Sequence, residues 1–522
     1  MKRLENLSGC ACCPVNRRRF LATGCAACAG ATGLLAATRS AAASDQKKTR
    51  VHLVYSIFDE VQPRATWPHI GFDFRPVMAR VESRLKEACP GIEFVTSMAD
   101  GPEAAKKIVA RDADAKVDGY LVMQMNNWPR VVQTIAATGK PTLLADFTYG
   151  GSGGFDLYTA ELLRKNRTNF GFVASSNLDD LIASAKCFEA VGNGATESFA
   201  AMTARVRCER TREPGDLACK PDDLKVLDTK DCLAAMKQGK ILAIGGRRNQ
   251  VWNAITDQLG IEVVDVPYAE LNAAWEAADK QRSNEFADRW QKTARKIEDV
   301  SRKTLEESGA MYLAQKTLLA RHGANAITIN CLGGFYGNHI HAYPCLGFHE
   351  LYNDGLIGAC ECDLYSTATM VALTAMTQGR PGFISDPVID TSKRQIIYAH
   401  CVASNRVFGP QGESNPIEIL THSEDRKGAS VRSLCPTGYM TTTVKFAPER
   451  KSMIFHQGKA VETPIEDRAC RTKLAAEPVG DFEKLFGEWD RWGWHRVTYY
   501  GDLKEPVFAL ADALGWKVVE EA

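Results

Sequence analysis

The sequence predicts an α/β fold, in which two doubly wound parallel-sheet domains precede a mostly β, barrel-like C-terminal domain. Two observations predict the parallel sheets: short β-rich runs alternate with helix-like runs from Val51 onward, and the same layout begins again at Ile241. Parallel strands need crossover connections, which are usually helices. Short β-rich runs with many turn residues after about residue 355 predict the barrel or sandwich.

The size and charge of the chain limit its domain count and its partners. A chain of 522 residues exceeds one core, and domains of about 150 residues suggest roughly three. We expect domains at residues 50–205, 206–354 and 355–522. The formal net charge of +1 offers no field for gathering nucleic acid.

The N-terminus predicts export. Arg17 and Arg18, followed one residue later by Phe20-Leu21, resemble a twin-arginine motif, and the Ala/Gly-rich segment behind them ends in small residues at Ala41–Ala43. We therefore expect residues 1–43 to be a twin-arginine signal peptide, and the mature protein to be periplasmic or extracellular. The segment has too few large apolar side chains for a core helix or a stable membrane span, so we expect no membrane insertion.

The first α/β unit has five predicted strands and three predicted helices between them. The strands are expected at Val51–Ile57, Ile92–Thr96, Gly119–Gln124, Pro141–Asp146 and Phe170–Ala174, and the helices at Pro76–Ala88, Pro102–Arg111 and Pro129–Thr138. This alternation is typical of a flavodoxin-like sheet. A further helical run covers Leu178–Val191.

The second unit repeats this layout without a visible repeat in sequence. Strands are expected at Ile241–Ile244, Ile261–Val266 and Ala326–Asn330, and a long polar helix pattern lies at about Ala274–Arg321. The third region has few helices until Glu505–Leu514.

The cysteines do not form a disulfide scaffold. Twelve follow the predicted signal, and most lie in apolar runs, where a free thiol acts as a small hydrophobic group. Cys208, Cys219 and Cys232, in a polar stretch, are the expected disulfide partners if any form. Cys360 and Cys362 lack a CxxC pair or a matching Cys/His partner, which argues against a thiolate metal site.

Polar and aromatic residues follow two strands of the first unit. Asn127 and Trp128 come after one strand, and Asp146 to Tyr149 after the next. Ligands of parallel sheets bind at the carboxyl ends of the strands. Amides, carboxylates and an indole suit a sugar, although ordinary loop chemistry explains the same residues. The Gly150–Gly154 run has neither the GxGxxG order nor a P-loop Lys, so no nucleotide site is predicted.

The metal-binding residue types gather where the second and third regions join. Glu361 follows a short apolar run, and Asp386 lies in a β-like run. Two carboxylates with a neutral imidazole form a hard ligand set that favours Mn²⁺ or Mg²⁺. His339 and His341 could supply an imidazole to the metal. The preferred interpretation is that the two histidines, His341 among them, lie at a strand end and form hydrogen bonds with the substrate or a loop.

Four segments of the chain resemble the L-fucose and L-arabinose isomerases. They are Ala359–Asp363 (ACECD), the strand with Asp386, Ala469–Thr472 and Gly493–Arg496 (GWHR). The resemblance implies that His495 completes the metal site with Glu361 and Asp386, and that His400 is a fourth ligand or supports the others. It also implies Mn²⁺, with Mg²⁺ or Co²⁺ as alternatives, and a trimer or hexamer in which Asn127 and Trp128 act on a neighbouring subunit's site.

The resemblance implies interconversion of an unphosphorylated aldose and ketose through an enediol. Glu361 and Asp386 are then the candidate catalytic residues, because carboxylates on either side of the C1–C2 bond can move a proton between the carbons. Two alternatives stay open. One is an exported sugar-binding protein without catalysis, and the other is a different metal-assisted sugar reaction, catalysed by an epimerase or lyase.

Overall fold

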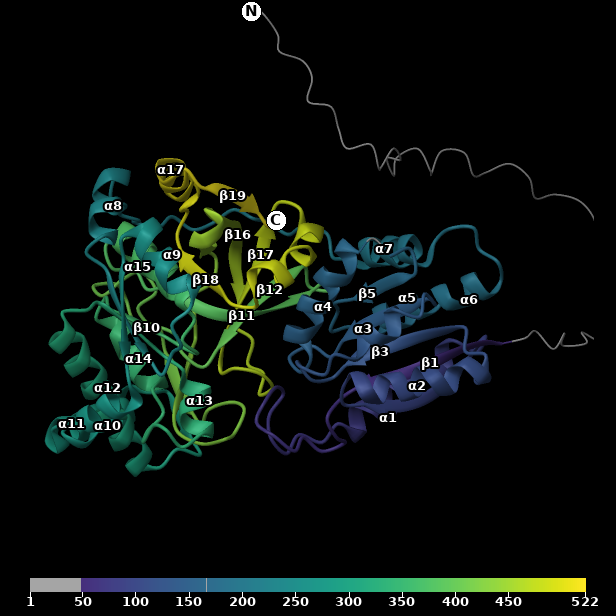
Figure 1. Ribbon diagram of the computed structural model, residues 1–522, viewed down its shortest axis with the longest axis horizontal. Helices are drawn as coiled ribbons and strands as arrows, with labels where there is room; N and C mark the ends of the chain where they lie inside the picture. The colour runs from purple at the N-terminus through teal and green to yellow at the C-terminus, as the bar shows by residue number, and fades with distance from the viewer. Residues whose placement is uncertain (1–47, 166) are drawn as a thin grey trace, which may run out of the picture. The chain divides into compact units, whose positions relative to one another are not determined.

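The computed structural model describes residues 48–165 and 167–522 (Figure 1). The predicted signal peptide at residues 1–43 lies outside them. Within the described part, the strands form two parallel sheets, one large mixed sheet and one small sheet. The α/β class with two parallel sheets and a β-rich C-terminal part confirms the fold class expected from the sequence.

The first sheet is parallel and has the strand order β2-β1-β3-β4-β5, which is the flavodoxin-like order. Its strands match the predicted runs to within a few residues. The strands are β1 (Thr49–Ser56), β2 (Ile92–Ala99), β3 (Gly119–Gln124), β4 (Thr142–Asp146) and β5 (Phe170–Val173), and the helices are α1 (Arg75–Ala88), α2 (Pro102–Ala115), α3 (Val131–Ala136), α4 (Ser152–Arg164), α5 (Leu178–Ala185), α6 (Cys187–Gly192) and α7 (Phe199–Arg210).

Helices cover both faces of this sheet. Alternate residues of β3 divide between two cores: Leu121 packs with α1, α5, α6 and α7, whereas Val122 packs with α2, α3 and α4. The second core also contains Ile389 and Ile396 from the C-terminal strands β11 and β12. The first sheet is therefore packed against the β-rich part of the chain, which brings its loops near the strands that carry Asp386.

The second sheet is also parallel, in the order β10-β9-β6-β7. Its strands are β6 (Lys240–Ile244), β7 (Glu262–Val266), β9 (Ala326–Ile329) and β10 (Ile357–Ala359); the helices around it are α8 (Thr229–Met236), α9 (Gln250–Leu259), α10 (Tyr268–Glu276), α11 (Lys280–Thr293), α12 (Arg302–His322), α13 (Cys331–Tyr336), α14 (Cys345–Asn353) and α15 (Leu364–Met376).

The expectation of one long helix over about Ala274–Arg321 is wrong. The segment is divided into α10, α11 and α12, and β8 (Lys296–Glu298) lies between the last two. β8 pairs in parallel with β13 (Ile417–Leu420), which in turn pairs with β14 (Ser430–Ser433). Asp279 and Ser301 cap the N-termini of α11 and α12. Strand pairing with a distant segment therefore overrides the local helix pattern.

Six antiparallel strands of the C-terminal part close into a barrel. The order is β15-β18-β11-β12-β17-β16, and β16 pairs back with β15; β19 is added in parallel to β16. These strands are β11 (Phe383–Asp390), β12 (Gln395–His400), β15 (Met440–Ala447), β16 (Ser452–Glu462), β17 (Thr472–Val479), β18 (Arg496–Tyr500) and β19 (Lys517–Glu520), with helices α16 (Trp489–Trp492) and α17 (Lys504–Leu514) and 3₁₀ turns η1 (Pro448–Arg450) and η2 (Phe482–Phe486).

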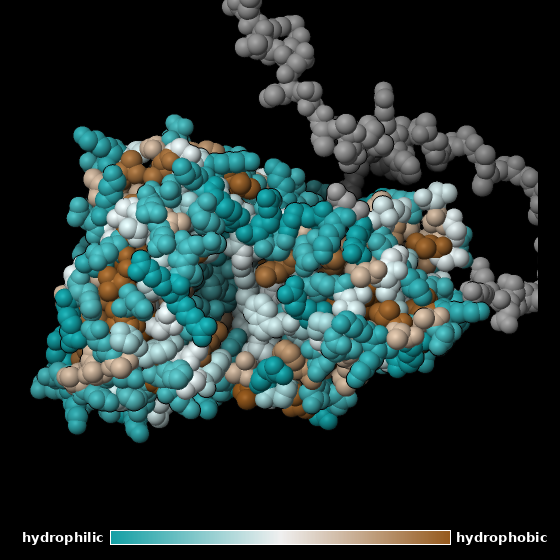
Figure 2. Space-filling view, in the orientation of Figure 1, coloured by the Kyte–Doolittle hydropathy of each residue, from teal (hydrophilic) through white to brown (hydrophobic). Residues whose placement is uncertain are grey.

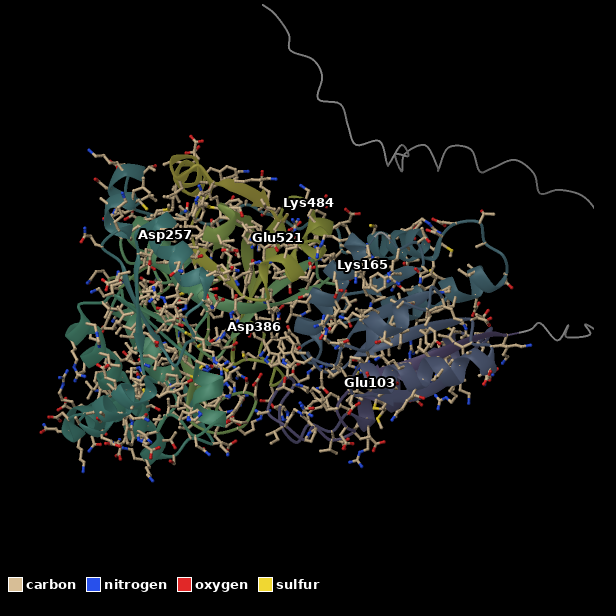
Figure 3. The ribbon with its side chains drawn as sticks, viewed as in Figure 1. Glu103, Lys165, Asp257, Asp386, Lys484 and Glu521 are labelled. Atoms are coloured by element: carbon tan, nitrogen blue, oxygen red, sulfur yellow. The ribbon has the colours of Figure 1, made fainter. Side chains whose placement is uncertain are left out.

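A buried ion pair ties the C-terminus to the barrel. The Arg496 guanidinium donates to both carboxylate oxygens of Glu521, at 3.1 Å and 2.6 Å, and neither side chain reaches solvent. Glu521 also lies 2.9 Å from Nδ1 of His456. Figure 3 labels Glu521 among the C-terminal strands and Asp386 nearer the middle of the molecule. Although burial opposes it, Arg496 lowers the pKa of Glu521 to about 2.

The twelve cysteines of the described part are free thiols, so Cys208, Cys219 and Cys232 are not disulfide-bonded. Cys208 is exposed, whereas Cys232 is a buried residue of α8. None of the helices in residues 48–165 and 167–522 has the length and apolar character needed to cross a membrane. Figure 2 shows a largely hydrophilic face on which hydrophobic residues occur in small groups.

Replacing Glu521 with Gln should lower the free energy of unfolding by about 3–5 kcal/mol, because the Arg496 charge is left buried without a counter-ion. Urea unfolding followed by tryptophan fluorescence measures this difference. The matched control is Glu520→Gln, whose exposed carboxylate lies 3.5 Å from Lys504 and should contribute less than about 1 kcal/mol. Equal stabilities of the two variants would contradict the assigned role of the pair.

The same pair sets a pH dependence. The pKa of Glu521 is lower in the folded chain than the usual value of about 4.3, so its stabilisation is complete above that value and is lost as the pH falls toward about 2. The Glu521→Gln variant should lack this component of acid destabilisation.

Candidate functional site

The barrel register and the second sheet bring the predicted metal-binding residues together. In β11, Asp386 is opposite Ala399 of β12, and its neighbour Ser385 is opposite Arg496 of β18. His495, directly before β18, therefore lies beside Asp386. Glu361 enters from the second sheet, in the turn between β10 and α15.

The turn that carries Glu361 is strained. Glu361 and Cys362 have φ angles of +59° and +52°, in the left-handed region that side chains with a Cβ rarely adopt. Each such residue costs on the order of 1–3 kcal/mol and persists only where the surroundings enforce it. This backbone conformation points the Glu361 carboxylate toward the barrel. The Glu361 side chain is 33% exposed.

The distances within the cluster are short. His495 Nε2 lies 3.0 Å from Asp386 Oδ1 and 3.6 Å from Glu361 Oε2. The ring centroids of His400 and His495 are 5.7 Å apart. Glu361, His400 and His495 each offer one ligand atom, and these atoms all lie within 4.8 Å of one another. The cluster can therefore hold a metal ion.

Asp363 sets the orientation of His495. Its Oδ2 lies 2.9 Å from His495 Nδ1 and 3.3 Å from the Lys445 ammonium, and its Oδ1 caps α15 by accepting from the backbone N–H of Ser366. With Nδ1 donating to Asp363, Nε2 of His495 is directed at Asp386 and Glu361. A carboxylate that holds the far nitrogen of an imidazole is the usual support of a histidine ligand.

The charges in the cluster favour a bound cation. Burial, opposed by His495, raises the pKa of Glu361 to about 8. Burial alone would lower the pKa of His495, but Asp386, Asp363 and Glu361 raise it well above its usual value. Burial would likewise raise the pKa of Asp363, but Lys445 and His495 hold it well below its usual range. Three carboxylates thus surround one imidazole, so a divalent ion that displaces the imidazole proton would balance their negative charge.

Two buried atoms in the cluster lack hydrogen bonds. Asp386 Oδ1 makes the ion pair with His495 but no well-formed hydrogen bond, and His400 Nε2 has no partner within the described residues. Buried polar atoms are normally satisfied, so both are available to a ligand. The carboxylates of Glu361 and Asp386, including the unsatisfied Asp386 Oδ1, fit a hard divalent ion.

A cavity of about 410 Å³ opens beside the cluster. Trp67, Trp128 and Trp494 form an aromatic wall, with ring centroids 5.0 Å apart between Trp67 and Trp494 and 5.3 Å between Trp128 and Trp494. Trp67 follows β1 and Trp128 follows β3, the two strands at which the order of the first sheet reverses. Crevices at such reversals are the usual ligand sites of parallel sheets. A second cavity, of about 570 Å³, shares Glu361, Trp128 and Trp494 and adds Lys445.

The other sequence-predicted residues have different places. Trp128 lines the cavity of its own chain and is 47% exposed. Asn127 is buried and its side chain accepts from the backbone N–H of Gly153, so it shapes the loop. His341 lies 3.2 Å from Glu276, outside the lining of the cavity.

Lys445 and Trp67 belong to the site but were not predicted from the sequence. Lys445 is an isolated charge in an otherwise uncharged strand, Met440–Ala447, which is a signal for a buried cation that pairs with a distant acid. No local pattern marks Trp67. Its place in the wall depends on a loop that crosses to the barrel, where the backbone N–H of Ala469 donates to the Pro68 carbonyl.

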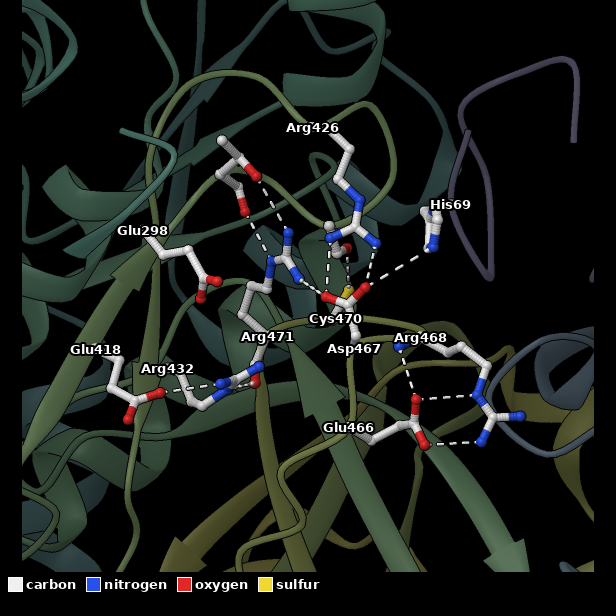
Figure 4. A network of polar contacts seen from close by, with 12 residues as sticks. His69, Glu298, Glu418, Arg426, Arg432, Glu466, Asp467, Arg468, Cys470 and Arg471 are labelled. Carbon is white, nitrogen blue, oxygen red and sulfur yellow. Dashed lines mark hydrogen bonds and ion pairs between the residues drawn. The ribbon is translucent and has the colours of Figure 1, made fainter. Parts of the chain in front are cut away.

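An ion-pair network supports the loop that precedes β17 (Figure 4). Asp467 accepts from Arg471 and Arg426 and lies 3.8 Å from His69. Arg471 is buried and also donates to the Thr421 carbonyl at 2.7 Å. The loop places Cys470 against the cluster, with its Sγ 4.0 Å from Asp386 Oδ2.

Sequence comparison finds similarity to sulfoquinovose isomerases over part of the chain. No protein-family model matches the chain. A sulfoquinovose isomerase from Clostridium sp. (strain MSTE9) is 25% identical over 227 residues, covering 42% of this chain and 49% of that protein. A sulfoquinovose isomerase from Priestia megaterium is 22% identical over 257 residues, covering 47% and 55%. The chain thus spans about half the length of the curated relatives it matches.

Two solved structures overlap with parts of the chain. A sugar ABC transporter from Yersinia enterocolitica is 12% identical, with a TM-score of 0.16 over 54% of this chain and 66% of that one. A periplasmic solute binding protein from Actinobacillus succinogenes with bound D-allose is also 12% identical, with a TM-score of 0.17 over 63% and 91%. Scores this low add nothing to the assignment of function.

The assignment to the L-fucose and L-arabinose isomerases is wrong, because the curated proteins that match are sulfoquinovose isomerases. The segments that suggested it, such as ACECD and GWHR, are a few residues long. Carboxylates and imidazoles beside strand ends are common to many metal sites. They therefore do not distinguish one family of sugar isomerases from another.

Replacing Asp363 with Asn should weaken Mn²⁺ binding about 10–100-fold. The amide oxygen can still cap α15, but the amide N–H₂ in place of Oδ2 cannot accept from His495 Nδ1. Calorimetric titration of the metal-free protein measures the affinity. Ser366→Ala is the matched control, because it removes a 2.7 Å bond to the same Oδ2 and leaves the carboxylate in place. An unchanged affinity in Asp363→Asn would show that Asp363 does not orient His495.

Proposed function

We propose that the protein is a metal-dependent isomerase that interconverts an unphosphorylated aldose and ketose. The observation that carries this proposal is the convergence of Glu361, Asp386 and His495 beside a cavity with an aromatic wall. The distant similarity to sulfoquinovose isomerases supports the same reaction class.

Glu361, Asp386 and His495 are the proposed metal ligands. Because Asp363 accepts from Nδ1, Nε2 is the nitrogen of His495 that would bind the ion once its proton has been displaced. His400 differs, because its Nδ1 accepts from the backbone N–H of Cys401 at 3.0 Å, so the neutral ring carries its proton on Nε2. Burial lowers the pKa of His400 and keeps the ring neutral. We therefore assign His400 as a donor to a substrate oxygen.

Mn²⁺ is the proposed ion, since oxygen ligands with one imidazole suit it, with Mg²⁺ or Co²⁺ as alternatives. Such an ion supplies polarisation of the carbonyl and the adjacent hydroxyl of an open-chain sugar.

Glu361 and Asp386 are the proposed acid and base. Carboxylates on either side of the C1–C2 bond could take a proton from one carbon and return it to the other. One carboxylate removes the proton from C2 while the carbonyl oxygen at C1 gains a proton, which forms the enediol. The enediol then gains a proton at C1 while the C2 hydroxyl loses its own, which gives the ketose with no net change in protons. The Trp67, Trp128 and Trp494 rings shield this transfer from water and offer apolar faces to the C–H groups of the sugar.

Glu361→Gln and Asp386→Asn should each lower turnover by about 10²–10⁴-fold and reduce the Mn²⁺ content of the purified protein. The assay is a panel of unphosphorylated aldoses that includes sulfoquinovose, with and without added Mn²⁺, combined with elemental analysis. Glu462→Gln, an exposed carboxylate paired with Lys393, is the control. Wild-type activity in both site variants would overturn the assignment.

The same measurements separate the alternatives. Equilibrium dialysis that finds tight sugar binding unaffected by EDTA, with no product, would favour the exported sugar-binding protein over the isomerase. Product analysis by NMR separates aldose–ketose interconversion from epimerisation or elimination.

We also propose that the protein is exported through the twin-arginine pathway, on the strength of Arg17 and Arg18. Changing both to Lys should retain the protein in the cytoplasm of a bacterial host that has this pathway, as measured by cell fractionation. Arg3→Lys, outside the motif, is the control and should be exported normally. Export of the double variant would contradict the proposal.

A further inference from the structure

The cavity beside the metal cluster has a third carboxyl side chain, which the proposed reaction does not use. Glu424, in the connection between β13 and β14, lines this cavity of about 410 Å³ together with Glu361 and Asp386. His495 pairs with Glu361 and Asp386, whereas no ion pair involves Glu424 within residues 48–165 and 167–522. Glu424 therefore lacks the contacts that commit the other two carboxylates to the metal cluster.

The neighbours of Glu424 in this connection are bound elsewhere. Asp425 Oδ1 lies 3.1 Å from His422 Nδ1, and Asp425 does not line the cavity. Arg426 donates to both carboxylate oxygens of Asp467, at 2.9 Å and 2.6 Å (Figure 4). Glu424 is thus the residue that brings an acid group from this connection to the cavity.

One oxygen of the Glu424 carboxylate is held in place, and the other is accessible. Oε2 accepts from the Tyr336 hydroxyl at 2.8 Å. Oε1 has no hydrogen-bond partner in the described part of the chain, and it is not among the enclosed atoms, which include Asp386 Oδ1. The Glu424 backbone carbonyl accepts from the N–H of Ile70 at 2.8 Å, which ties this segment to the loop that carries Trp67. The cavity wall therefore presents a positioned acceptor atom.

A positioned carboxylate oxygen suits a sugar hydroxyl. In the proposed isomerase the metal ion polarises the oxygens at C1 and C2, so the hydroxyl groups from C3 onward contact the remaining cavity wall. A hydrogen bond to a charged acceptor is about twice as strong as one between neutral groups. Burial raises the pKa of Glu424 to about 7, although His422 and the Tyr336 hydroxyl oppose this, so the group is mostly ionised at pH 8.

We propose that Glu424 is a specificity-determining residue, whose Oε1 accepts a hydrogen bond from one substrate hydroxyl at C3 or beyond while Tyr336 holds Oε2. This inference rests on the proposed function. It gives the isomerase a preference for aldoses that carry this hydroxyl, because a bound analogue without it covers the carboxylate oxygen but does not satisfy it.

Deoxy analogues of the best aldose substrate test this hydrogen bond. Each analogue lacks one hydroxyl group, at C3, C4, C5 or C6, and kcat/KM is measured at pH 8 with saturating Mn²⁺. For the wild type, kcat/KM should be about 10–100-fold lower for at least one analogue than for the parent aldose. In Glu424→Leu, which has a side chain of similar size without an acceptor, the selectivity against that analogue should disappear, and the selectivity against the others should remain. Glu424→Gln, with a neutral acceptor, should be intermediate.

Two controls separate this role from a structural one. Glu413→Gln, which changes an exposed acid outside both cavities, should keep the wild-type selectivity. The Glu424 variants should keep the Mn²⁺ content of the wild type, unlike variants of the ligands Glu361 and Asp386.

Wild-type selectivity in Glu424→Leu, or an equal loss of kcat/KM for the parent aldose and every analogue, would refute the role of Glu424 and leave the isomerase proposal intact. If Glu424→Leu does not fold, unchanged selectivity in Glu424→Gln refutes the role in the same way. A wild-type protein that converts no aldose would instead remove the isomerase proposal and this inference together.

Discussion

The buried pair of Arg496 and Glu521 is the interaction on which the candidate site depends. The Arg496 guanidinium, besides binding Glu521, donates to the backbone carbonyls of Gly493 and His495 at 2.7 Å and 3.1 Å. It therefore fixes the turn before β18, and with it the positions of Trp494 and His495. Because Glu521 follows β19, the last strand, the geometry of the metal cluster depends on how the end of the chain docks on the barrel.

The site is assembled from three parts of the chain, and none of them holds it alone. The barrel supplies Asp386, His495 and Trp494, the second sheet supplies Glu361, and the loops of the first sheet supply Trp67 and Trp128. Such a division keeps charged ligands on regular strands and strained turns, while loops cover the substrate. It also means that the cavity forms only when the first sheet packs on β11 and β12, as the shared core with Ile389 and Ile396 requires.

The sequence predicted what local patterns determine. The inner strands β3 and β4 of the first sheet are apolar runs buried on both faces, so β3 could be located to the residue. Glu361 and Asp386 were found because carboxylates beside buried strands are unusual. The link from Lys445 through Asp363 to His495 could not be predicted, since it joins residues up to 132 positions apart. The break between α11 and α12 depends on the pairing of β8 with β13. The sequence around the break therefore does not predict it.

Glu361 and Asp146 both have raised pKa values, but their surroundings differ. His495 lies beside Glu361 and also contacts Asp363 and Asp386, so several oxygens converge and a divalent ion can satisfy them together. Asp146 has one oxygen committed to Ser152, and its other oxygen is enclosed without a hydrogen-bond partner among the described residues. The number of converging oxygens therefore determines which of these carboxyl groups suits a metal ion.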